Sequence, residues 1–525
     1  MSDDNVKLRK AIYALLIAIA IGSLTGRIWN VESRSGQTPF LSANDMSRWC
    51  TIRALVDHGT YSIDDVMYAK DKTTRWSTID KVYHLGPDGK RHFYSSKPTL
   101  MPTIMAGQYW VIKNTIGISI AERPFYVGRM MLTITQCGLL LVYLIILVQI
   151  IERYGKTDWG RIFVFASAGF GTFITTFGVT LNNHSFAAVA CLIAIDCWLK
   201  IWIDGRREYR LFCIAAVAAA FTAANELPAL SLFGLLGLTL LIKDYKKTII
   251  AGIPGALLVI VPFFATNYIA HGVIRPPYMH RSDGVVLTEL PVDSAAPLNN
   301  SAVDESLREA MGGVSFNLSE SPKVEVREPG QRWVLDDPVL DRQWALQKVD
   351  NKIEIRQWDN WYDYRGTYWK VGSTQGIDKG EPSKAVYAFH MLIGHHGVFS
   401  LTPIWIFSFI GLGMMVKRKD TNWKQFAALV LFLTVLCTMF YIFRPLKDRN
   451  YGGVTCGFRW LFWFAPLWLV AMIPAADWVA KGKWAKIIAS VLLGISAISA
   501  SYAAMNPWTH PWMYDYLEYL GWITP

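Results

Sequence analysis

The chain has 525 residues, of which 52% are hydrophobic and 18% are charged, and its mean hydropathy is +0.24. Ordinary soluble domains carry more charge, and repeated apolar runs of about 18 or more residues are typical of membrane-spanning helices. The net charge of +11 comes from small basic groups between these runs and not from one basic face. This arrangement follows the positive-inside rule and argues against nucleic-acid binding. We therefore expect an all-α polytopic membrane protein.

Eleven apolar runs are predicted to cross the membrane. The first covers residues 11–28, and Trp29 follows it where a signal peptide would have small residues for cleavage, so we expect a retained helix. Each of the eleven is long enough, or nearly so, to cross about 30 Å of hydrocarbon. The other ten cover residues 126–150, 160–180, 185–203, 209–224, 227–242, 248–270, 397–416, 423–443, 458–479 and 485–503.

A further run, residues 98–118, is predicted not to cross. Without it, short loops that together hold twenty Lys and Arg residues alternate with short loops that hold almost none. If it crossed, basic pairs such as Arg206-Arg207 would lie on the outer side, against the positive-inside rule. We therefore expect a juxtamembrane or re-entrant helix on the outer side, with the amino terminus inside and the carboxyl terminus outside.

The chain is expected to have three parts. Residues 1–270 form a membrane module whose first outer loop is 30–97, residues 271–396 form an outer segment or small domain, and residues 397–525 form a second membrane module. Residues 42–58 have the spacing of an amphipathic helix at the membrane interface. The outer segment ends in an aromatic cluster of Trp358, Trp361, Tyr362, Tyr364, Tyr368 and Trp369. Such rings can stack on a sugar or acceptor, or can simply rest at the interface.

One outer loop, residues 443–460, breaks the charge rule. It carries four basic residues: Arg444, Lys447, Arg449 and Arg459. Guanidinium groups hold phosphate through paired hydrogen bonds, and Lys97 and Arg129 stand at the same outer boundary. We predict that these six residues bind a lipid phosphate. Contact with lipid headgroups is the alternative.

Acidic and polar residues share this outer face: Asp45, Asn182, Asn183, His184 and Glu226. Glu226 lies in very apolar surroundings at the bilayer boundary, where an ionisable group usually serves a function. A carboxylate here could take the proton of an acceptor hydroxyl while cations stabilise a leaving phosphate. We assign no metal or cofactor. Asn182, His184, Glu226 and the adjacent pair His395 and His396 are candidate contacts for a sugar or acceptor.

Three features of the first 150 residues occur in a fixed order. Residues 41–45 read Leu-Ser-Ala-Asn-Asp, residues 94–100 read Tyr-Ser-Ser-Lys-Pro-Thr-Leu, and Arg129 precedes the next span. Together they resemble the C-type membrane glycosyltransferases, most closely the branch of protein O-mannosyltransferases and lipid A aminoarabinose transferases. The resemblance implies a polyprenyl- or dolichyl-phosphate sugar donor, Asp45 as the base, and Lys97 and Arg129 near the lipid phosphate. The chain departs from the branch in Lys-Pro-Thr-Leu, where Lys-Pro-Pro-Leu is expected.

The pattern and the resemblance together predict an inverting glycosyltransferase of a bacterial inner membrane, with its site on the periplasmic face. The donor is a polyprenyl-phosphate sugar, and the acceptor is a hydroxyl of a glycan, lipid or protein. Asp45 is the predicted general base, although it could instead cap a helix or pair with Arg48 or Arg53. A transporter or flippase of a lipid-linked sugar, and an outer-face polysaccharide polymerase or ligase, are the other candidates. Carriers place charged groups near the midplane, whereas here they gather at one face.

Overall fold

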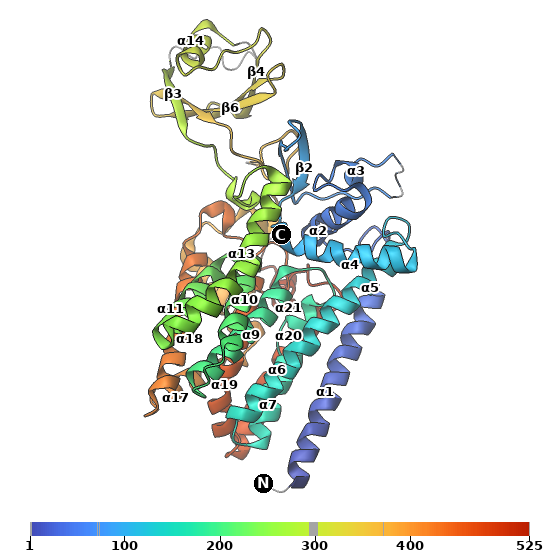
Figure 1. Cartoon of the computed structure of the whole chain (residues 1–525), viewed down its shortest axis with the longest axis vertical. Coiled ribbons are helices and arrows are strands. Elements are labelled where there is room, and N and C mark those ends of the chain that lie inside the picture. The colour runs from blue at the N-terminus through green and yellow to red at the C-terminus, as the bar shows by residue number, and fades with distance from the viewer. Residues whose placement is uncertain (1–2, 71, 73, 293–302, 371, 524–525) are drawn as a thin grey trace.

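The chain folds into a helical membrane protein with two outer segments at one end of its bundle (Figure 1). The computed structural model describes residues 3–70, 72, 74–292, 303–370 and 372–523. Within these ranges, eight helices are long and apolar enough to cross a membrane: Asp4–Asn30, Pro124–Tyr154, Asp158–Phe177, Asn183–Trp202, Tyr245–His271, Thr421–Ile442, Arg459–Val479 and Lys483–Tyr502. Shorter apolar helices cover Tyr209–Asn225, Leu227–Lys243 and Trp405–Val416. Ten of the eleven apolar runs fall largely on one of these helices, whereas the run 397–416 is divided between a short helix, Val398–Leu401, and Trp405–Val416.

The two outer segments interrupt the bundle, one between residues 30 and 124 and the other between residues 271 and 384. Its first half contains α1 (Asp3–Asn30), α5 (Pro124–Leu132), α6 (Gly138–Tyr154), α7 (Asp158–Phe170), α8 (Ile174–Phe177), α9 (Asn183–Trp202), α10 (Tyr209–Asn225), α11 (Leu230–Lys243), α12 (Tyr245–Lys247) and α13 (Ile253–His271). Its second half contains α15 (Lys384–Leu392), α16 (Val398–Leu401), α17 (Trp405–Val416), α18 (Thr421–Ile442), α19 (Ala465–Val479), α20 (Lys483–Tyr502) and α21 (Trp512–Tyr519).

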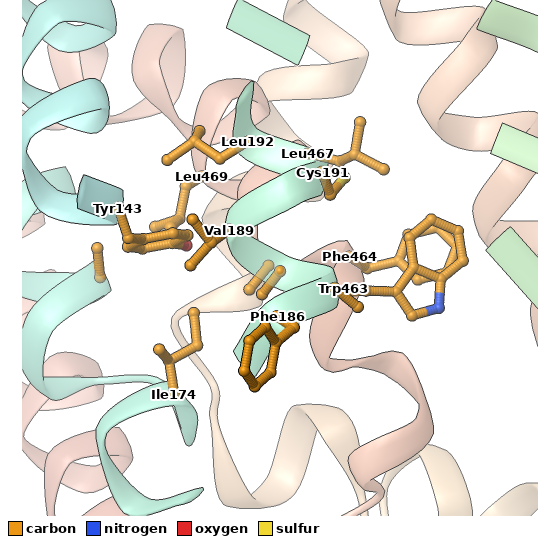
Figure 2. Close-up of a cluster of buried hydrophobic side chains, with 14 of the residues drawn as sticks. Tyr143, Ile174, Phe186, Val189, Cys191, Leu192, Trp463, Phe464, Leu467 and Leu469 are labelled. Carbon is orange, nitrogen blue, oxygen red and sulfur yellow. The ribbon is translucent and has the colours of Figure 1, made fainter. Parts of the chain in front are cut away.

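Helix α9 lies in the core of the bundle. Nearly all of its residues are buried, as expected for a helix that is apolar around its whole circumference. Figure 2 shows Val189 of this helix packed among its neighbours, with Tyr143 of α6 on one side and Leu467 of α19 on another. Close packing around α9 fixes the position of its first turn, which carries Asn183 and His184.

Ion pairs bring the beginning of α1 and the end of α6 to the same end of the bundle. The Arg9 guanidinium is 2.6 Å from the Glu152 carboxylate, and it also pairs with Asp158 at the start of α7. Between residues 9 and 152 the chain must therefore cross the bundle an even number of times. Helix α1 and the continuous helix α5–α6 account for two crossings. Helix α4 (Leu100–Ile116) consequently keeps both ends at the opposite end, where Figure 1 shows it lying across the bundle.

The first outer segment packs against this opposite end. It contains α2 (Ala43–Arg53), a π-helical turn (Ala54–His58), α3 (Asp64–Met67), and an antiparallel hairpin of β1 (Lys81–Leu85) and β2 (Arg91–Ser95). A helix was expected over residues 42–58 with Trp49 as an exposed anchor; the helix is present, but Trp49 is not exposed. Trp49 is fully buried and stacks on Phe40 with ring centroids 4.6 Å apart, because the hairpin and α4 cover this helix.

The second outer segment contains a small antiparallel sheet, so the expected all-α fold is wrong there. Its strands are β3 (Val286–Pro291), β4 (Lys323–Glu328), β5 (Arg332–Asp337), β6 (Arg342–Val349) and β7 (Lys352–Gln357), in the order β3-β7-β6-β5-β4. Trp333 of β5 faces Leu346 of β6, and α14 (Glu305–Gly313) covers this apolar face with Leu307. Each strand is short and carries charged residues on its other face, so its apolar pattern is weak in the sequence.

The non-crossing helix α4 can be tested with single introduced cysteines and a membrane-impermeant maleimide. Lys90 and Glu122 are exposed and flank α4, so cysteines at both positions are expected to react from the same side of the membrane. Cysteines at the exposed positions Lys156 and Lys246 are expected to react from the other side. Six of the seven native cysteines are buried, which keeps the background low. Labelling of positions 90 and 122 from opposite sides would contradict this arrangement.

Candidate functional site

A cavity of about 900 Å³, called here the bundle cavity, lies at the end of the bundle opposite Arg9. Its walls come from the start of α2, the start of α4, the first turn of α9, the connection between α10 and α11, and residues 440–460. Seven cationic side chains line it: Arg34, Arg48, Lys97, Arg281, Arg444, Lys447 and Arg459. Four carboxylates also line it: Asp80, Glu226, Asp378 and Asp448. The excess of positive charge favours an anionic ligand.

Two of these carboxylates form ion pairs with lining cations. Asp80 lies 2.8 Å from the Lys97 ammonium, and Asp448 lies 3.0 Å from Arg281 and 3.5 Å from Arg444. Burial raises the pKa of Asp80, but the charge and hydrogen bond of Lys97, together with the charges of Arg459 and Arg48, outweigh this effect, so the pKa lies below its ordinary value. Burial lowers the pKa of Lys97 to about 8, although Asp80 opposes the change. Lys97 therefore loses its charge at a mildly alkaline pH.

Two lining guanidinium groups are buried without a carboxylate partner among the described residues. Arg48 is 3% exposed and Arg459 is 9% exposed. Arg48 donates to both oxygens of Asn44, and to the side-chain oxygen of Asn183 at 2.7 Å. Burial and the charge of Arg459 lower the pKa of Arg48 to about 10. Because buried charges are costly unless they are compensated, this pair is suited to receive an anion.

The backbone at Gly452 holds Arg459 in place. The Arg459 Nε and Nη2 groups donate to the Gly452 carbonyl at 3.0 and 2.8 Å. Tyr451, Gly452 and Gly453 all have positive φ, and that of Gly452 is 100°. A Cβ atom at Gly452 would lie 2.8 Å from Arg459 Nε. Glycine is therefore required here both for its backbone conformation and for the close approach of the guanidinium.

A hydrogen-bonded chain connects Arg459 to Glu226 through His184. Arg459 Nη1 lies 2.8 Å from His184 Nε2, and His184 Nδ1 contacts the Glu226 carboxylate. Arginine can only donate, so Nε2 accepts and Nδ1 carries the proton that is donated to Glu226. The Asn183 amide donates to the same Glu226 oxygen at 2.7 Å. His184 therefore joins the cation of one loop to the carboxylate of another.

Asp45, the base expected from the sequence, is not among the residues that line the bundle cavity. It is 1% exposed, and its carboxylate accepts five hydrogen bonds. Four come from residues at the start of α2, where Asp45 and Ser42 form a capping box, and the fifth comes from the Thr180 hydroxyl at 2.7 Å. Burial raises the pKa of Asp45, against the effect of these bonds. In this position Asp45 stabilises the start of α2, the helix that also carries Arg48.

Two basic residues expected at the phosphate also lie outside the cavity lining. Arg129 donates to the Val31 carbonyl at 2.7 Å and lies over the Phe125 ring. Arg449 donates to the Pro382 carbonyl at 2.8 Å. Both guanidinium groups hold backbone segments together.

The expected polar and aromatic contacts divide between the cavity and other places. Glu226, His184 and Trp369 line the cavity. Five others do not: Asn182 caps α9, His395 and His396 pack with Tyr451, Trp361 stacks between His84 and His280, and Trp358 lies near Arg332. Among the described residues, no group of three or more His, Cys, Asp or Glu side chains is placed to hold a metal ion.

Sequence reasoning missed several residues that line the cavity. Arg48 stands four residues after Asn44, which also lines the cavity, so helical spacing could have placed the two side chains on the same face. Asp80, Arg281 and Asp378 stand in irregular segments far apart in the chain, where no periodicity predicts their meeting.

The structural role of Asp45 can be tested by Asp45→Asn. An amide has one oxygen where the carboxylate has two, so donors at the start of α2 lose partners, and unfolding is expected to become easier by about 1–3 kcal/mol. Asp65→Asn, at an exposed position of α3, is the matched control and should leave stability unchanged. Thermal unfolding of the purified protein in detergent measures both. Equal stability of the two variants would contradict the role assigned to Asp45.

Comparison of the sequence with models of protein families finds no match, and comparison with curated proteins finds none. The resemblance to C-type glycosyltransferases therefore rests on the short motifs of the first 150 residues. Of the residues in those motifs, Lys97 lines the bundle cavity, whereas Asp45 and Arg129 do not.

Proposed function

We propose that this protein is a membrane glycosyltransferase that moves a sugar from a polyprenyl-phosphate donor to an acceptor hydroxyl at the outer face of a bacterial inner membrane. The observation that carries the proposal is the meeting of Arg48, Lys97 and Arg459 in a cavity at one end of a membrane bundle. Two of these cations have no carboxylate partner in the described part of the chain. A phosphate would supply the missing negative charge and would accept several charged hydrogen bonds.

The cavity also reaches apolar surface, which suits a lipid tail. Phe440, near the end of α18, and Leu227, between α10 and α11, both line the cavity and are about half exposed. The same face of α18 continues with exposed Val435, Leu436 and Met439. A polyprenyl chain could therefore lie along the bundle while its phosphate reaches the cations. A soluble sugar nucleotide would have no use for this apolar rim.

Transfer needs a carboxylate that can take the proton of the acceptor hydroxyl. Asp80 and Asp448 form ion pairs with cations, and Glu226 is held by His184 and Asn183. The fourth carboxylate of the cavity, Asp378, has a different environment.

Asp378 accepts hydrogen bonds only from uncharged groups. These are the Tyr368 hydroxyl at 3.1 Å and the Asn450 amide at 3.3 Å, and no Lys or Arg forms an ion pair with it in the described ranges. Burial raises the pKa of Asp378, although the hydrogen bonds from Tyr368 and Asn450 and the charge of Arg459 oppose the change. A raised pKa makes a carboxylate a stronger base. We therefore assign the proton transfer to Asp378 in place of Asp45.

The proposed reaction separates the base from the phosphate. The acceptor oxygen attacks the anomeric carbon as its proton moves to the Asp378 carboxylate. The bond between that carbon and the phosphate oxygen breaks, and its electron pair stays on the phosphate beside Arg48, Lys97 and Arg459. Positioned cations stabilise the charge that develops there. A flippase needs access to both faces of the membrane, whereas these groups all gather at one end.

Phosphate binding can be tested with undecaprenyl phosphate and native mass spectrometry. Arg48→Gln and Arg459→Gln are each expected to weaken binding by about 1.5–3 kcal/mol, or roughly 10- to 150-fold, for each charged hydrogen bond lost. Arg129→Gln is the matched control, because Arg129 is a basic residue of the same boundary that does not line the cavity. If Arg129→Gln alone bound undecaprenyl phosphate more weakly, the phosphate site would not lie in the bundle cavity.

The pH dependence of binding follows from Lys97, whose pKa is about 8. Lys97 is charged below this pH and neutral above it, so affinity for undecaprenyl phosphate is expected to be highest near pH 7 and to fall as the pH rises through 8 to 9. The phosphate keeps its charge over this range, since its second pKa is about 6. Lys97→Arg should bind with little change up to pH 9. A wild-type affinity that is flat between pH 7 and 9 would contradict the role of Lys97.

A further inference from the structure

A second cavity, called here the outer cavity, adjoins the bundle cavity. Its volume is about 860 Å³, and its walls come from β4, β5, residues 360–370, residues 372–379 and residues 445–447. Five residues line both cavities: Arg281, Tyr362, Trp369, Asp378 and Lys447. The two cavities therefore meet at a shared wall, and that wall contains the carboxylate to which we assign the proton transfer.

The outer cavity combines aromatic rings with free positive charge. Tyr362, Tyr364 and Trp369 line it. The two tyrosines are buried, and Trp369 is partly exposed, so Trp369 offers the ring that can stack on the apolar face of a pyranose. Its lining has seven cationic residues and three acidic ones, so its potential is positive. Two of the cations form ion pairs: Arg327 with Asp363 and Glu325, and Arg332 with Asp363 and Asp283.

Besides Lys447 of the shared wall, three cations of the outer cavity are exposed and form no ion pair within the described residues. They are Arg365, Lys370 and Lys379. They stand on the same stretch of chain as Trp369 and Asp378, so the aromatic surface, the free charges and the carboxylate are close together. A neutral sugar would use the ring alone, whereas a sugar that carries carboxylates would use the ring and the charges.

We propose that the outer cavity is the acceptor site and that the acceptor is an acidic saccharide. This inference rests on the proposed function, because it gives the acceptor for the same transfer. The Trp369 ring stacks on the saccharide, and the three free cations bind its acidic groups. One hydroxyl of the saccharide then reaches Asp378 at the shared wall. Its proton passes to Asp378 as its oxygen bonds to the anomeric carbon of the donor in the bundle cavity.

Binding can be measured by calorimetry on the full-length protein in lipid nanodiscs. Tetragalacturonic acid is the probe, maltotetraose is the neutral comparison and tetraglutamate is the acidic peptide comparison. Tetragalacturonic acid is expected to bind at least about tenfold more tightly than either, since only it matches both the ring and the charges. If maltotetraose bound with equal affinity, the cations would not contribute to binding, and the assignment of an acidic acceptor would be overturned. Equal or tighter binding of tetraglutamate would overturn the saccharide assignment.

Substitution of the free cations tests the location. The triple variant Arg365→Gln, Lys370→Gln, Lys379→Gln should bind tetragalacturonic acid about tenfold more weakly, because three exposed charges each contribute modestly. The matched control is Lys90→Gln, Lys323→Gln, Lys348→Gln, which removes three exposed lysines outside the cavity. Similar affinity of the two triple variants would overturn the proposal.

Undecaprenyl phosphate, measured on the same samples, separates the two proposals. It should bind the triple cavity variant as tightly as the wild type, which also shows that the variant is folded. Normal binding of the lipid without preferential binding of tetragalacturonic acid would overturn the acceptor site alone. Failure of the wild type to bind the lipid would overturn the proposed function, and the acceptor role with it.

Discussion

The architecture of the cavity depends on the hydrogen bonds of one buried guanidinium group, that of Arg459. It donates to the carbonyl of Gly452 and to the ring of His184, whose other nitrogen donates to Glu226. These contacts join the loop before α19, the first turn of α9 and the connection between α10 and α11. Because the bonds to Gly452 and His184 are made to uncharged groups, they orient Arg459 without neutralising it. The positive charge stays available to whatever enters the cavity.

The same principle explains the position of Arg48. Asn44 and Asn183 accept its hydrogen bonds through amide and carbonyl oxygens, so it is held in place and keeps its charge. Asp45 stabilises the start of the helix that carries it. Lys97, which has a carboxylate partner in Asp80, loses its charge at a lower pH than Arg48, so the cavity combines a lasting positive charge with one that depends on pH.

Hydropathy predicted the helical bundle well, because long apolar segments have few stable alternatives in a membrane. The basic residues of the loop 443–460 also identified Arg459 and Arg444 as candidate site residues, because Lys and Arg are uncommon in short outer loops. The sequence was less informative about which way a side chain points. Asp45 and Trp49 stand on a correctly predicted helix, yet Asp45 does not line the cavity and the Trp49 ring is not exposed. The hairpin and α4 cover that helix. Contacts between irregular segments, such as those around Asp80 and Asp378, have no periodic signal at all.

The wall of the bundle cavity is shared by all three parts of the chain. Arg48 and Lys97 come from the first outer segment, Arg281 from the segment that leads to the sheet, and Arg444 and Arg459 from the last third. During synthesis, Arg48, His184 and Glu226 are therefore made long before the residues that complete their surroundings. The site can form only after the spans that follow residue 459 have entered the membrane. Until then His184 and Glu226 lack the cation that will hold them, and a chain that stops early leaves these polar groups exposed to the quality-control machinery of the cell.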